Sequence, residues 1–275
     1  MERPQREGNS RSRRGPAGRK GGPPPRQRVR VFLEGRYRKY VRDLPQTIFY
    51  CPRCKGRKGG CDFCGGFGKL TKDSIQELIA RKALRAFKSR KGKFHGAGRE
   101  DIDVRMLGEG RPFIFEVIDP KVLEVDLAEL EREINEYAAG RIDITGLHRV
   151  ERKRVAILKE TPTDKIYRAL VETEEPVPEE KLHSLPGTRI RIVQRTPARV
   201  AHRRADKERI RQVTIRSAEP QGERLLSVEV RAEHGTYIKE WISGDEGRTR
   251  PSLGDLLGTP GVCRELDVLE ILPLT

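Results

Sequence analysis

Two stretches of the chain place apolar residues at the three-to-four-residue spacing of an amphipathic helix. The first covers residues 75–87, and Ser74 with Glu77 has the pattern of a capping box at its start. The second covers residues 126–137, with Gly140 as the expected end signal. Both helices carry a single apolar stripe, so we expect them to flank a sheet.

Elsewhere the apolar positions follow the alternation of β-strands. No internal repeat is visible, and few helical stretches interrupt the strands. These proportions predict an α+β fold with a mixed or antiparallel central sheet flanked by few helices. The expected strands cover residues 113–118, 142–158, 165–173, 189–194, 209–215, 225–232 and 266–272.

One stretch combines a glycine turn with a charged strand pattern. Gly98 closes a Gly-x-Gly turn, after which Asp101, Asp103 and Arg105 alternate with apolar residues. This period of two predicts a half-buried strand from about residue 101. Such a strand can hold a carboxylate rigidly at the floor of a cleft. A solvated, ion-paired strand face has the same pattern, so charge alone leaves both interpretations open.

The chain is strongly basic. Its 275 residues include 57 Lys and Arg against 41 Asp and Glu, which gives a formal net charge of +16. An enzyme that acts on small metabolites has no need of that excess, whereas a polyphosphate partner attracts it. A thermophile-type ionic surface is the alternative, but it explains charge of both signs rather than the imbalance. The charge therefore favours a nucleic-acid partner.

Composition also divides the chain. Residues 1–28 are rich in Arg, Gly, Pro and Ser, and we expect a disordered basic arm that adds nonspecific affinity for phosphates. An inert solubilising tail is the alternative. Residues 29–275 are expected to form one folded domain with a small insertion at residues 50–69. The chain has no apolar run of membrane length and no apolar signal segment, so we expect a cytoplasmic protein.

Four of the five cysteines lie in that insertion as two Cys-x-x-Cys pairs. Cys51 and Cys54 form the first pair, and Cys61 and Cys64 form the second. Two such turns can direct four thiolates at one ion, which predicts a structural Zn²⁺ site. A redox dithiol and an iron–sulfur cluster are the alternatives. Cys263 is distant in sequence and is expected to be a small core residue.

The segment Gly98-Arg99-Glu100-Asp101 resembles the Gly-Arg-x-Asp motif of pseudouridine synthases. The longer string to Phe113 is similar to the archaeal and eukaryotic tRNA pseudouridine synthases of the tenth family. The resemblance implies the pseudouridine synthase fold and the isomerisation of uridine in the TΨC arm, at tRNA positions 54 and/or 55. It makes Asp101 the nucleophile and implies no organic cofactor. The zinc knuckle resembles an archaeal insertion, and we expect the family's N-terminal THUMP-containing region to be missing.

Two further matches supply catalytic candidates. Residues 235–242 resemble the motif that carries a cation beside the catalytic Asp, so Lys239 is expected to pair with Asp101 and keep it ionised. Tyr167 lies in an alternating strand and matches a tyrosine that stacks on the target base in the family. Core packing is the alternative for this ring.

Contacts with RNA are expected from rings and cations outside the catalytic set. Residues 35–40 interleave tyrosines with cations and resemble the family's entry to the catalytic domain. The basic run 194–207 resembles a family segment that suits tRNA backbone contacts. His202 within it is a weaker candidate for metal binding or acid–base work. With tRNA as the partner, we expect a monomer without membrane contact. The expected RNA-contacting residues are Arg99, Arg36, Tyr37, Arg199, Arg203, Arg204 and Lys207.

Two other function classes fit parts of the sequence. A noncatalytic zinc-knuckle RNA-binding protein is favoured if Asp101 lies far in space from the other catalytic candidates. A metal-dependent nuclease would use Glu100, Asp101 and Asp103 to hold Mg²⁺.

Overall fold

The described part of the chain is organised by a ten-stranded sheet. The computed structural model describes residues 29–57, 59–202 and 204–272, so the expected basic arm lies outside the described residues. The strands are β1 (Arg30–Lys39), β2 (Lys91–Gly96), β3 (Val104–Ile118), β4 (Ile142–Val150), β5 (Lys165–Thr173), β6 (Arg189–Arg195), β7 (Glu208–Gly222), β8 (Leu225–Ala232), β9 (Thr249–Arg250) and β10 (Gly261–Ile271).

Short helices fill the connections. Within the described residues, no helix is long and apolar enough to cross a membrane. The helices are α1 (Ile75–Ala86), α2 (Leu127–Ala138), α3 (Lys153–Glu160), α4 (Glu179–His183), α5 (Ala198–Ala201), α6 (Ile238–Ser243) and α7 (Leu253–Leu257), with 3₁₀ turns η1 (Asp62–Cys64) and η2 (Asp245–Gly247).

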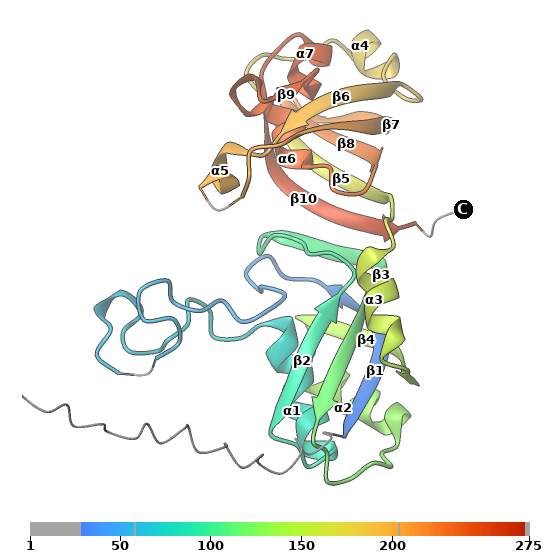
Figure 1. The fold of residues 1–275 in the computed structure, drawn as a ribbon. Helices are drawn as coiled ribbons and strands as arrows, with labels where there is room; N and C mark the ends of the chain where they lie inside the picture. The colour runs from blue at the N-terminus through green and yellow to red at the C-terminus, as the bar shows by residue number, and fades with distance from the viewer. Residues whose placement is uncertain (1–28, 58, 203, 273–275) are drawn as a thin grey trace, which may run out of the picture.

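The strand order divides the molecule into two halves (Figure 1). The order is β4-β1-β3-β10-β5-β8-β7-β6-β9, with β2 paired to β3 beside this path. One half holds β1 to β4 with α1, α2 and α3, and the other holds β5 to β10 with α4 to α7. All pairings are antiparallel except that of β3 with β10. The expected α+β class with a mixed sheet is confirmed.

The two halves join where β3 runs parallel to β10. Only three residue pairs make this ladder, from Val104 opposite Leu266 to Met106 opposite Val268. Gly108 has a φ of +56°, and a Cβ there would lie 2.0 Å from the carbonyl oxygen of Leu269, so any side chain would push the strands apart.

Ion pairs close the same junction. Arg105 donates two hydrogen bonds to Asp267, at 2.8 and 2.6 Å. The Arg42 guanidinium donates to the carbonyl oxygens of Asp103 and Leu266, at 3.1 and 2.8 Å. Because Arg42 bonds the residues just before β3 and a residue of β10, the start of β3 is fixed to both halves.

The observed helix starts agree with the sequence patterns. The Ser74 hydroxyl accepts from the Glu77 amide at 3.2 Å, and Asp126 caps α2 by accepting from two backbone amides. Two expectations were wrong. The strand expected over residues 142–158 ends at Val150 and gives way to α3, and the strand expected from residue 101 begins at Val104. In the first place a charged run followed by apolar residues forms a helix, and in the second an alternating charged stretch forms a turn.

Candidate active site

Asp101 lies in the tight connection between β2 and β3, at the junction of the two halves. Gly98 takes a φ of +79° there, and the Val104 amide donates to the Asp101 carbonyl oxygen at 3.1 Å. Asp101 and Asp103 therefore stand on a turn rather than on the expected strand face. The Asp101 side chain is 43% exposed, so its carboxylate is open to solvent while its backbone is fixed.

A buried ion pair lies beneath this turn. The Glu100 carboxylate is 2.8 Å from the Arg111 Nε, and the side chains are 1% and 2% exposed. Arg111 also donates from Nη1 to the Ala97 carbonyl oxygen at 2.7 Å. The Tyr37 hydroxyl donates to the Glu100 carboxylate at 2.8 Å from each oxygen. Removing one partner of such a pair leaves an uncompensated buried charge and costs roughly 3–5 kcal/mol.

Side chains from β1 and the segment after it hold the turn from below. The Gln46 amide nitrogen donates to the Tyr37 hydroxyl at 2.8 Å and to the Gly98 carbonyl oxygen at 3.0 Å. The buried Lys39 donates to the carbonyl oxygens of Asp101 and Ile102, at 3.2 and 2.9 Å. Burial lowers the pKa of Lys39 to about 8. The backbone on both sides of Asp101 thus has fixed hydrogen-bond partners.

Two cations from the other half reach the Asp101 carboxylate. Arg199, on α5, lies 3.0 Å from it, and Lys239, on α6, lies 3.9 Å from it. Each cation is closer to a second acid. Arg199 donates from Nε to Glu240 at 2.5 Å, and Lys239 donates to Asp103 at 2.6 and 2.8 Å.

This arrangement differs from the expected one in two residues. Lys239 was expected to pair with Asp101 and does form an ion pair with it at 3.9 Å, but its hydrogen bonds go to Asp103. Burial would raise the pKa of Asp103, but the hydrogen bond and charge of Lys239 lower it below the ordinary value. Arg199 was expected to meet RNA, yet its guanidinium is the cation that hydrogen-bonds Asp101. Sequence reasoning gave no role to Glu240, which is buried inside the motif that carries Lys239.

Tyr167 enters from β5, where it pairs with Val268 of β10 and Val230 of β8. Its ring is partly buried against the core. Burial raises the pKa of Tyr167 to about 12. The charge of Arg111 lowers this pKa by a smaller amount, and the charge of Glu100 raises it. A phenol with this pKa stays protonated at neutral pH and is a hydrogen-bond donor rather than a base.

The expected RNA-contacting residues near β1 have different surroundings. Arg99 is exposed, two residues before Asp101 in the sequence. Arg36 is half-buried and donates to the carbonyl oxygens of Glu109 and Gly110, at 2.7 and 2.8 Å. Tyr37 is fully buried, and burial followed by the Glu100 charge raises its pKa well above the ordinary value. A ring in this position cannot stack on a base, so the expected RNA contact for Tyr37 is incompatible with the fold.

In the basic run of residues 194–207, some side chains are bonded within the protein and others are exposed. Arg204 donates to the Tyr237 hydroxyl at 2.6 Å, whereas the Lys207 side chain is exposed. Arg203 lies outside the described residues. Among the acids proposed for a nuclease, Glu100 is buried on Arg111 and does not join the other two. In the described chain, four cysteines are the only group of three or more acidic, His or Cys residues close enough to share a metal ion.

Those cysteines are Cys51, Cys54, Cys61 and Cys64, whose sulfur atoms all lie within 4.8 Å of one another. The Cys51 and Cys61 sulfurs are 3.8 Å apart, and the Cys54 and Cys64 sulfurs are 3.7 Å apart. Metal–sulfur bonds of about 2.3 Å in a tetrahedron put the sulfurs about 3.8 Å apart. The Gly68 amide donates to the Cys64 sulfur at 3.2 Å. The four side chains therefore fit a tetrahedral metal ion.

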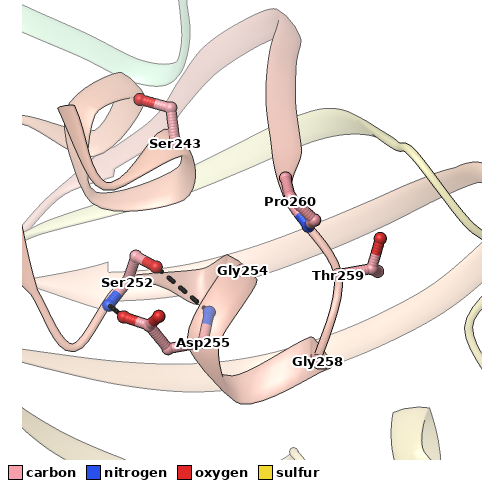
Figure 2. A pocket seen from close by; sticks show the side chains of 7 residues that line it. All are labelled: Ser243, Ser252, Gly254, Asp255, Gly258, Thr259 and Pro260. Atoms are coloured by element: carbon pink, nitrogen blue, oxygen red, sulfur yellow. Dashed lines mark hydrogen bonds between the residues drawn. The ribbon is translucent and has the colours of Figure 1, made fainter. Parts of the chain in front are cut away.

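A separate polar pocket of about 430 Å³ lies beside α7 (Figure 2). Ser252 and Asp255 on its wall satisfy each other as a capping box, in which each side chain accepts from the other's backbone amide. The remaining wall is formed by small residues of α6, α7 and the turn before β10. None of the catalytic candidates lines it, so this pocket belongs to the packing of α7.

The chain is similar to known proteins over most of its length. The family described as "Pus10, C-terminal" matches residues 32–272. A protein of Methanocaldococcus jannaschii called tRNA pseudouridine synthase Pus10 is 46% identical over 243 residues, which are 88% of this chain and 53% of that protein. A protein of the same name from Methanothermobacter marburgensis is 47% identical over 243 residues, 88% of this chain and 60% of that protein.

The chain thus spans little more than half the length of the curated relatives it matches. Among solved structures, a chain in a Cbf5–Nop10–Gar1 complex aligns with a TM-score of 0.41 and 20% identity, over 72% of this chain and 45% of that one.

The buried network yields a stability prediction. Replacing Tyr37 by Phe keeps the ring but removes a donor from Glu100 and an acceptor from Gln46. We expect the free energy of unfolding in urea to fall by about 1–3 kcal/mol. Tyr40→Phe is the matched control, because that hydroxyl bonds Asp143 at the surface. Its effect should stay within about 0.5 kcal/mol, and equal losses for the two variants would contradict a special role for the buried network.

Proposed function

Because the chain belongs to the Pus10 C-terminal family, we propose that it is a tRNA pseudouridine synthase with Asp101 as its nucleophile. The observation that carries this proposal is the position of Asp101. Its carboxylate is exposed at the junction of the halves, on a turn that the buried Glu100–Arg111 pair supports, and two cations approach it from the opposite half. The substrate we propose is a uridine in the TΨC arm, at tRNA positions 54 and/or 55. The protein would act in the cytoplasm as a monomer.

The reaction is an isomerisation that balances without a cofactor. The bond between N1 of uracil and C1′ of the ribose breaks, and its electron pair leaves with the base. The detached base rotates, C5 bonds to C1′, C5 loses its proton and N1 gains one. The target nucleotide must first leave its stack, which costs a few kcal/mol and favours a loop over a duplex. The Asp101 carboxylate would assist departure of the base as a nucleophile or as a negative charge beside the ribose.

The other candidates are given roles that their surroundings allow. Tyr167 would stack on the flipped uracil or donate a hydrogen bond to it, because its phenol stays protonated at neutral pH. Arg199 and Lys239 would orient the Asp101 carboxylate, since both cations lie close to it. Arg99, exposed two residues before Asp101, would hold a flanking phosphate or occupy the space that the flipped base leaves.

We propose further that the four cysteines hold one structural Zn²⁺. The distances between their sulfurs suit a tetrahedral ion with four thiolate ligands. Bound zinc would stabilise the fold of a segment that has almost no apolar core of its own, because the binding free energy becomes folding free energy. Four protein ligands leave no open position, so the site would take no part in the chemistry.

The assignment of Asp101 predicts that Asp101→Asn abolishes pseudouridine formation. Asparagine keeps the shape of the side chain but removes the nucleophilic charge. The measurement is pseudouridine-specific chemical mapping of an unmodified tRNA transcript, with circular dichroism and tRNA binding as controls of folding. Asp103→Asn is the matched control, since it removes a neighbouring carboxylate from the same turn. We expect it to lower the rate much less, and turnover by Asp101→Asn above that of Asp103→Asn would exclude Asp101 as nucleophile.

The metal proposal predicts one zinc per chain in protein purified without chelator. Single Cys→Ser changes at positions 51, 54, 61 and 64 should each weaken zinc retention and expose residues 49–70 to protease. Cys263→Ser is the control, because Cys263 lies outside the four-cysteine group and should leave zinc content unchanged. Mass spectrometry of the native protein and limited proteolysis measure both effects. Full zinc retention after any one of the four changes would rule out a four-cysteine site.

A further inference from the structure

The ribbon around the four cysteines carries an unusual set of exposed rings. We define it as residues 49–70, which leave the body after β1 and return at α1 (Figure 1). Short backbone contacts close it, including the Leu70 amide to the Phe49 carbonyl oxygen at 2.8 Å. Its five exposed large apolar side chains are Phe49, Tyr50, Phe63, Phe67 and Leu70, with exposed fractions of 40% to 54%.

The exposed rings of the ribbon stand out because the phenylalanines in the rest of the described chain are not exposed. The chain has eight phenylalanines, and the five outside the ribbon are buried or packed against a core. The other three are exposed, and all of them lie in the ribbon. A fold that buries its phenylalanines elsewhere keeps these rings in water, although exposed aromatic surface has a free-energy cost and invites contacts.

Cations accompany the rings. The Arg53 guanidinium lies over the Phe63 ring at 4.9 Å from its centre, and the Lys69 amine lies over the Phe67 ring at 5.2 Å. Lys55 and Arg57 are exposed, and neither forms an ion pair with any described residue. The ribbon sequence holds five basic residues and one acidic residue, Asp62. Even with the charge of −2 of a zinc ion with four thiolates, the surface is positive.

The fold of the ribbon does not need these rings for its stability. The four thiolates and a metal ion are sufficient to fix so short a segment. Tyr50 covers Gly56, where a Cβ would lie 2.7 Å from the ring, yet 54% of Tyr50 is still exposed. The surface therefore has the composition of a contact site rather than of a core.

We propose that this ribbon surface docks on an unpaired segment of the RNA substrate, with bases stacked on Phe63 and Phe67. This inference rests on the proposed RNA-modifying function. Interleaved rings and cations suit single-stranded RNA, because every base has a face that can stack and every linkage carries a negative charge. The core of a protein–protein interface is depleted in charged residues, and in lysine in particular. The ribbon thus recognises RNA outside the catalytic site and adds affinity for the tRNA.

The test compares Phe63→Leu/Phe67→Leu with Ile157→Ala, which trims an exposed apolar side chain of α3 away from the ribbon. Leucine keeps apolar volume but removes the stacking face. Fluorescence anisotropy with an unmodified tRNA transcript should show about a tenfold weaker Kd for the double variant and no change for the control. A single-stranded oligouridylate should compete better than a duplex for the wild type, and this preference should vanish in the double variant. The KM for tRNA should rise, whereas Asp101→Asn changes kcat.

A second variant keeps the test decisive if the rings also support the ribbon. Arg53→Gln/Arg57→Gln leaves every ring in place, and it should flatten the log–log salt dependence of Kd by about one unit for each lost phosphate contact. Zinc content measures folding of the ribbon for both variants. Unchanged tRNA affinity in both zinc-loaded variants would overturn the proposal, and it would leave a protein partner as the occupant of these rings. Because binding is measured without turnover, this outcome is distinct from a chain that binds RNA but forms no pseudouridine.

Discussion

The buried ion pair between Glu100 and Arg111 is the interaction on which the candidate site depends. It brings the connection between β2 and β3 against the sheet, because Glu100 lies next to Asp101 in sequence and Arg111 is part of β3. Tyr37 stands opposite Arg111 in the ladder of β1 with β3, so the hydroxyl that completes the carboxylate's shell is positioned by strand pairing. Burying two ions is unfavourable unless the pair has good geometry and the remaining polar atoms have hydrogen-bond partners. The Glu100 carboxylate meets this condition, because Arg111 and the Tyr37 hydroxyl both contact it. The orientation of Asp101 follows from this arrangement.

The second constraint is the narrow junction between the halves. Only three residue pairs join β3 to β10, and Asp101 stands just before them. The cations that reach Asp101 come from α5 and α6, both in the other half. The Arg105–Asp267 bonds and the Arg42 contacts therefore do more than stabilise the fold, because they fix the distance between the acid and its cations. The geometry around Asp101 therefore depends on how the two halves are joined.

The sequence predicted the parts of this arrangement that depend on local pattern. Apolar periodicity located α1 and α2, and the cysteine spacing predicted a metal-capable group that the fold brings together. The motif around Asp101 identified its exposed carboxylate, but the alternating charges after it suggested a strand where a turn exists. Contacts between segments that are distant in the sequence could not be predicted from local patterns. Tyr37 has the sequence context of an exposed ring among cations, and only the approach of β3 and of Glu100 makes it a buried support. Arg199 likewise is one of several arginines in a basic run, and only the folded position of α5 brings it to Asp101.

Two neighbouring acids, Glu240 and Asp103, explain why the cations near Asp101 do not bind its carboxylate more closely. A carboxylate held in a close two-point bond, as Asp267 is by Arg105 at 2.8 and 2.6 Å, has its oxygens occupied. Arg199 meets Asp101 less closely, at 3.0 and 3.5 Å, because its Nε is drawn to the buried Glu240 at 2.5 Å. Lys239 is drawn in the same way to Asp103 and stays 3.9 Å from Asp101. Glu240 and Asp103 therefore divert the two cations, so that their charges act on Asp101 while its carboxylate is held less closely than that of Asp267. In this arrangement the neighbouring acids set how tightly the Asp101 carboxylate is held.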